Sequence, residues 1–171
     1  MSIQEKLLIS ARNTVEYIHQ REYSGLIISG ASSLVSRMLL FHGWGEFYSL
    51  GCTRPKIYDF GQEGNELLYT GFNRIDNINE RIPFVLEFVK LNFPELLSHD
   101  GRLLYLDDHS HQGHKIGCLR NNFPQFGLGN IEFAVFVASV HLKDQNNLFV
   151  GLYDDKTADF LYNLSESLRN G

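Results

Sequence analysis

The sequence predicts an α/β protein built on a mostly parallel, twisted sheet with helices on both faces. Short apolar runs bounded by turn residues, typical of buried strands, alternate with segments whose apolar residues recur at helical spacing. Such alternation is typical of a parallel sheet, whose crossover connections place helices on both faces. With 171 residues, the chain is expected to form a single domain, residues 1–171.

The predicted elements, in order, are a helix over 3–20, a strand over 26–28, a helix over about 33–42, short strands over 47–50 and 57–58, a helix over 78–89 that stops near Pro94, a strand over 103–106, a helix containing Ile116 and Leu119, strands over 131–140 and 148–153, and a helix over 158–168. Ser2 and Glu5 have the spacing of a capping box at the first helix. Gly43 is expected to stop the second helix. Asp154 or Asp155 is available to cap the last.

Residues 59–75 do not fit this alternation. Gly61, Gly64 and Gly71 flank the apolar run 67–69, which indicates a mobile loop or a hairpin arm.

Charge and composition exclude some classes of partner. The chain has 15 basic and 20 acidic residues, a formal net charge of −5, and no basic cluster. This balance argues against nucleic acid or an anionic membrane as a partner. No segment approaches the roughly 20 apolar residues that span a bilayer, and no signal peptide is recognisable. Cys52 and Cys118 form no disulfide framework, so a cytoplasmic location is expected.

The acidic pair Asp107-Asp108 is the main candidate for a functional site. It follows the apolar run 103–106, and ligands of open α/β sheets bind at the carboxyl ends of strands. Neighbouring residues of a strand point to opposite faces, so at least one carboxylate needs water, a cation or a hydrogen-bond donor. A sugar diol, or Mg²⁺ bound to one, would suit the pair. The alternative is that the two acids only end the strand and cap the next turn.

The loop 109–115 is expected to lie over the amino end of the following helix, where free backbone N–H groups favour a phosphate. Gly113 would allow the close backbone approach that an anion requires.

Residues 102–115 as a whole resemble the phosphoribosyl-pyrophosphate (PRPP) motif of type I phosphoribosyltransferases. The motif has apolar residues, two acids, two mostly apolar positions, two small hydroxylic residues, a glycine, one variable residue and a final Thr or Ser. The two acids and the glycine match in identity and spacing. His109-Ser110 replace the apolar positions, His111-Gln112 the hydroxylic pair, and Lys115 the final hydroxylic residue.

This resemblance implies a phosphoribosyltransferase-like fold and a transfer of the phosphoribosyl group from PRPP to a nitrogenous base, with Mg²⁺. By position, Asp107 and Asp108 would hold the ribose hydroxyls, directly or through the metal ion. The 5-phosphate would be bound by His111, Gln112, Gly113, His114 and Lys115. The pyrophosphate would be bound by Gly30, Ala31, Ser32, Arg54 and Lys56. The segment 59–75 lies where the family has a flexible loop over the substrate.

The departures from the motif define a second hypothesis. Loss of the hydroxyls removes hydrogen bonds to a phosphate, and the larger side chains of His111 and Lys115 can fill its pocket. A noncatalytic protein of this fold that binds a phosphorylated ligand or a protein partner is therefore the alternative.

The three histidines allow more than one role. His109, His111 and His114 beside two carboxylates are residue types that bind zinc or iron, which would suit a metal-dependent hydrolase. The histidines could instead lie on a solvated loop or face a phosphate. Aromatic residues between 44 and 60 indicate a hydrophobic cluster, a subunit interface of a homodimer, or a surface that stacks on a base.

Overall fold

The computed structural model describes residues 1–29, 32–48, 51–61, 78–111, 113–128, 131–144 and 147–170. Five parallel strands form one sheet: β1 (Gly25–Ile28), β2 (Lys56–Asp59), β3 (Leu103–Ser110), β4 (Ile131–Ala138) and β5 (Leu148–Tyr153). Their spatial order is β2-β1-β3-β4-β5. The predicted α/β class and parallel sheet are confirmed.

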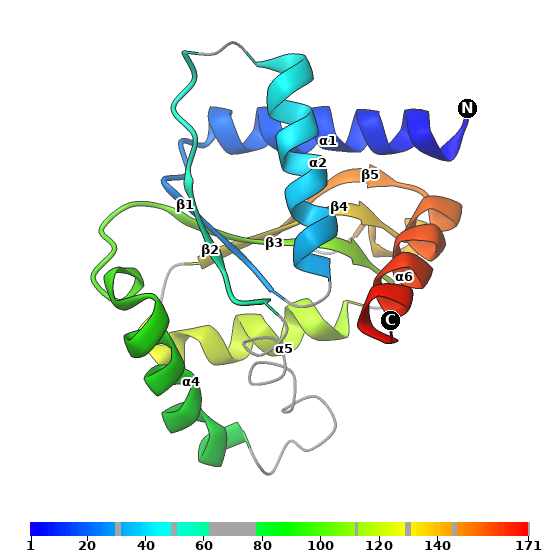
Figure 1. Cartoon of the computed structure of the whole chain (residues 1–171). Helices are drawn as coiled ribbons and strands as arrows, with labels where there is room; N and C mark the ends of the chain where they lie inside the picture. The colour runs from blue at the N-terminus through cyan, green and yellow to red at the C-terminus, as the bar shows by residue number, and fades with distance from the viewer. Residues whose placement is uncertain are drawn as a thin grey trace.

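Helices cover both faces of the sheet (Figure 1). One face packs against α1 (Ile3–Gln20), α2 (Ser32–Phe47) and α6 (Asp155–Asn170) through a cluster that includes Val15, Leu26, Leu104 and Phe136. The other face packs against α4 (Ile78–Asn92) and α5 (His114–Asn122). Short 3-10 turns follow α4, α5 and β4, at Pro94–Leu96, Phe123–Phe126 and Val140–Leu142.

The helix ends follow the local sequence signals. Ser2 and Glu5 form the expected capping box at α1. Of the two candidate caps for α6, Asp154 is the one used, because its carboxylate accepts from the backbone N–H of Thr157 at 2.9 Å and from its hydroxyl at 2.7 Å.

The predicted stop at Gly43 is wrong, because α2 continues through this residue to Phe47. A Cβ atom at Gly43 would lie 2.9 Å from a methyl carbon of Val15 and 3.0 Å from the carbonyl oxygen of Ala11. The glycine therefore permits close packing of α2 on α1. The strand predicted over 47–50 is also wrong at Phe47, and residues 49 and 50 lie outside the described residues, as do most of 59–75.

The strand order indicates where a ligand would bind. The connections reverse direction between β1 and β3, and in a sheet of order 2-1-3-4-5 the crevice at that reversal is where ligands bind. Within the described residues, no helix is long and apolar enough to cross a membrane.

Candidate functional site

The candidate site lies at the carboxyl ends of β1, β3 and β4, which are neighbours in the sheet. The strand was predicted over 103–106, but β3 continues to Ser110. Asp107 and Asp108 therefore lie within the strand. Strand β4 ends at Ala138, and the backbone N–H of Ser139 donates to the carbonyl of Ser110 at 3.0 Å. The predicted loop 109–115 is accordingly shorter, because His109 and Ser110 extend β3 and α5 begins at His114.

Asp107 faces the α5 layer of the sheet and is only 3% exposed. One of its carboxylate oxygens lies 2.7 Å from Nζ of Lys115, in the first turn of α5, and the other accepts from the backbone N–H of Asp108 at 3.0 Å. Burial, and then the nearby Asp108 carboxylate, raise the pKa of Asp107 above its usual range. The Lys115 ammonium acts in the opposite direction and stabilises the charged form.

Asp108 faces the opposite layer, as strand alternation requires, and is fully buried. One carboxylate oxygen accepts from the Ser165 hydroxyl of α6 at 2.7 Å. The other accepts from the backbone N–H of His109 at 2.9 Å, and Nδ1 of the same histidine lies 2.9 Å away. The two acids are therefore neighbours in sequence that contact different helices.

An imidazole and phenol cluster lies beside Asp108. The rings of His109, His111 and Tyr162 contact one another edge to face, with centroids 5.4–5.8 Å apart. Nδ1 of His111 lies 3.2 Å from the Ser139 hydroxyl, and its Nε2 lies 3.6 Å from the carboxylate of Asp159. Two of the predicted histidines thus join this cluster.

The amino terminus of α5 has the features of an anion site. Gly113 is its N-cap, in the left-handed conformation with φ of 74°, and no side chain caps the helix. The first N–H groups of a helix have no intrahelical acceptor, and the helix dipole favours negative charge there. Gly113 and the backbone of His114 and Lys115 form this helix start, and their binding of a phosphate stays a prediction. Gln112 lies outside the described residues.

The pyrophosphate segment is only partly described. Gly30 and Ala31 lie outside the described residues, and Ser32 is the first residue of α2. Ser29, which precedes them at the end of β1, is buried, and its hydroxyl lies 2.6 Å from that of Tyr105.

Arg54 and Lys56 are not brought to this edge of the sheet. Lys56 is the first residue of β2, at the amino end of the strand, and its ammonium pairs with Glu95. The Arg54 guanidinium lies 5.1 Å from the centre of the Trp44 ring. Neither basic side chain contacts the acidic pair in the arrangement described.

The two acids do not fit one Mg²⁺ ion as they lie. Their carboxylates point to opposite faces of β3, and each is already engaged by Lys115 or by Ser165 and His109. Across the part of the chain that the structure describes, no group of three or more His, Cys, Asp or Glu side chains is arranged to hold a metal ion.

Four side chains of the site were missed from sequence: Ser139, Asp159, Tyr162 and Ser165. The last three lie on α6, and no local pattern connects them with β3. Their approach depends on how α6 crosses the end of the sheet.

Comparison with known proteins gives a distant similarity of structure. No family model matches the sequence, and no curated protein sequence matches it. Among solved structures, a hypoxanthine-guanine-xanthine phosphoribosyltransferase is similar with a TM-score of 0.45 and 13% sequence identity, over 89% of this chain and 73% of that one.

Proposed function

We propose that this is a phosphoribosyltransferase-like α/β protein that binds a phosphorylated small molecule at the carboxyl edge of its sheet and does not transfer the phosphoribosyl group. The observation that carries the proposal is the engagement of both acids inside the protein. Asp107 pairs with Lys115 at 2.7 Å, and Asp108 accepts from Ser165 at 2.7 Å.

The phosphate end of the ligand is assigned to the amino terminus of α5. Gly113 brings the backbone into a left-handed turn there, and the first N–H groups of the helix, which have no intrahelical acceptor, favour an anion together with the helix dipole. Lys115 lies in the same turn and adds a positive charge, part of which Asp107 neutralises. The resemblance of residues 102–115 to a PRPP motif supports a sugar phosphate as the ligand.

The engagement of Asp107 and Asp108 argues against transfer of a phosphoribosyl group. A ribose diol would have to replace the donors that the acids already have, and each hydrogen bond to a charged group contributes about 1.5–3 kcal/mol. Asp107 and Asp108 are at most 3% exposed, so the hydroxyls of a sugar would reach their carboxylates only after the surrounding side chains moved. The residues that would stabilise ribosyl transfer are thereby used to hold α5 and α6 against β3.

Transfer of a phosphoribosyl group to a nitrogenous base, with Mg²⁺, is the second candidate. It is favoured by the position of the two acids on β3, next to the reversal of strand order where α/β proteins bind ligands. It requires Lys115 and Ser165 to release the carboxylates when substrate binds.

Calorimetric titration with ribose 5-phosphate tests the proposed binding site. Gly113→Asp adds a carboxylate at the phosphate position, and Asp tolerates the left-handed conformation. Gly127→Asp is the matched control, because Gly127 also has a positive φ, of 76°, with no atom near its Cβ position.

Wild type and Gly127→Asp should bind alike, and Gly113→Asp should bind about tenfold more weakly or worse, through repulsion of like charges. Equal affinity of the two variants would place the phosphate elsewhere.

A further inference from the structure

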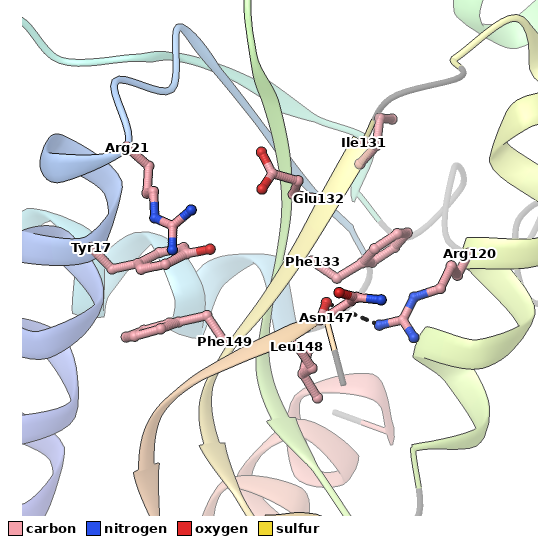
Figure 2. Close-up of a pocket in the computed structure, with 9 residues that line it drawn as sticks. All are labelled: Tyr17, Arg21, Arg120, Ile131, Glu132, Phe133, Asn147, Leu148 and Phe149. Atoms are coloured by element: carbon pink, nitrogen blue, oxygen red, sulfur yellow. Dashed lines mark hydrogen bonds between the residues drawn. The ribbon is translucent and has the colours of Figure 1, made fainter. Parts of the chain in front are cut away.

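A cavity of about 540 Å³ lies at the other end of the sheet, around the amino ends of β4 and β5 (Figure 2). Phe149 and Tyr17 line it on the α1 side, where their rings stack with centroids 3.9 Å apart. Phe133 and Leu148 line it on the α5 side. The cavity therefore extends across the edge of the sheet from one helical layer to the other, and its volume is that of a small-molecule site.

One arginine lies on each side of this cavity. The guanidinium group of Arg21, the C-cap residue of α1, lies 5.3 Å from the centre of the Tyr17 ring. Arg120 of α5 lies 5.4 Å from the centre of the Phe133 ring and donates to the carbonyl of Asn147 at 3.2 Å. Figure 2 shows the two guanidinium groups on opposite sides of the strand ends.

Neither of these guanidinium groups has an acidic partner within 4 Å among the residues that the structure describes. Glu132, which also lines the cavity, is paired with Arg102 at 2.7 Å. Two positive charges are thus left to attract anions. Stacking on an aromatic ring restrains a guanidinium group and leaves its N–H edges available for phosphate oxygens.

The polar groups between the arginines suit hydroxyls. The carboxylate of Glu132 accepts hydrogen bonds, and the side-chain amide of Asn147 both donates and accepts. Asn147 has a positive φ of 65°, and this conformation turns the chain into β5 with its carbonyl on Arg120.

We propose that this cavity binds an elongated, hydroxylated organic anion with a phosphate group at each end, of the size of a sugar bisphosphate. Arg21 holds one phosphate and Arg120 the other. The site is separate from the carboxyl edge of the sheet, so the proposal does not depend on the function assigned to that edge.

Calorimetric titration with fructose 1,6-bisphosphate tests this site, with fructose 6-phosphate as the single-phosphate comparison. Arg21→Gln and Arg120→Gln each remove one charge from the cavity. Arg12→Gln is the matched control, since Arg12 also lies on α1 with its guanidinium over an aromatic ring, that of Phe47.

The bisphosphate should bind wild type and Arg12→Gln equally, and about tenfold more tightly than the monophosphate. Each cavity variant should lower its affinity to about that of the monophosphate. Equal binding of the two ligands by wild type, no binding of either, or unchanged binding by both cavity variants would overturn the proposal.

Hydrogen exchange on the wild-type protein gives a second readout that needs no variant. Saturating bisphosphate should protect the amides of 131–133 and 147–149 while leaving those of 107–115 unchanged. Protection confined to 107–115 would place the ligand at the carboxyl edge and refute the second site.

Discussion

The ammonium nitrogen of Lys115 lies 2.7 Å from a carboxylate oxygen of Asp107, joining the first turn of α5 to the centre of the sheet. Removal of one member of a buried ion pair leaves an uncompensated charge and typically costs about 3–5 kcal/mol. We expect Lys115→Met to lose stability near this range, and Lys115→Met with Asp107→Asn to recover most of the loss. Urea denaturation of both single variants and the double variant measures the coupling, and additive losses would show that the pair contributes little.

The same ion pair gives a pH dependence to the Lys115→Met variant. Burial raises the pKa of Asp107, and replacement of Lys115 removes a positive charge that opposes that shift. An acid with a raised native pKa destabilises the native state as pH rises through that pKa. Lys115→Met should therefore lose stability relative to wild type above the ordinary value for Asp of about 3.9, as the pH rises from the raised pKa of wild-type Asp107 toward neutral pH. A constant difference across this range would contradict the assignment.

The hydroxyl of Ser165 on α6 donates to the fully buried carboxylate of Asp108. A hydrogen bond to a charged group contributes about 1.5–3 kcal/mol, so Ser165→Ala should reduce the free energy of unfolding by about that amount. Ser167→Ala, on the exposed side of the same helix, is the control and should change it by no more than about 0.5 kcal/mol. Similar effects of the two substitutions would show that Asp108 does not depend on this donor.

Two glycines of α2 should respond to alanine in opposite directions. Gly45 has open space at its Cβ position, and alanine is up to about 1 kcal/mol more favourable than glycine in a helix. Gly43→Ala should instead destabilise the protein by about 1–3 kcal/mol, because its methyl group would press on Val15 and the backbone of Ala11. Thermal denaturation of both variants checks this contrast, and a gain at Gly43 would mean that α1 and α2 pack less closely.

Asp154 links the start of α6 to Lys6 of α1 and should make stability depend on pH in acid. Hydrogen bonds from Lys6 and Thr157 lower the pKa of Asp154 to about 2. A lowered native pKa stabilises the protein above the unfolded value of about 3.9, and this contribution is lost as pH falls toward about 2.

Asp154→Asn retains a cap but cannot titrate, so the advantage of wild type over this variant should shrink between about pH 4 and about pH 2. Denaturation curves at a series of pH values measure it. An advantage that stays constant would rule out the linkage.

The sequence predicted the elements whose signals are local. Strand β5 has the bounds expected from its apolar run, and the Ser2–Glu5 box begins α1 as its spacing indicates. The length of β3 was underestimated because Asp107-Asp108-His109-Ser110 is polar and does not look like a buried strand. Its polar groups are satisfied by side chains distant in sequence, such as Ser165, 57 residues beyond Asp108.

In the candidate site, too, local features could be predicted from the sequence and long-range contacts could not. Gly113 was predicted to bring the backbone close to an anion; the structure gives this glycine a positive φ at the start of α5, and the bound anion stays a prediction. The use of Asp107 and Asp108 as internal anchors could not be predicted, because it depends on the positions of Lys115 in α5 and of α6 against the sheet. The charge patterns in the sequence equally gave no indication that Arg21 and Arg120 would share one cavity.

The most direct test of the central claim is the Kd of PRPP for wild type and Asp107→Asn, measured by calorimetry with Mg²⁺ and with a chelator. If Asp107 only neutralises Lys115, its replacement releases a cation beside the phosphate site, and the Kd should stay the same or fall in both conditions. Wild type should bind without Mg²⁺. A rise in Kd of about tenfold or more in Asp107→Asn, or binding that requires Mg²⁺, would show that the acids hold the ribose and would contradict the proposal.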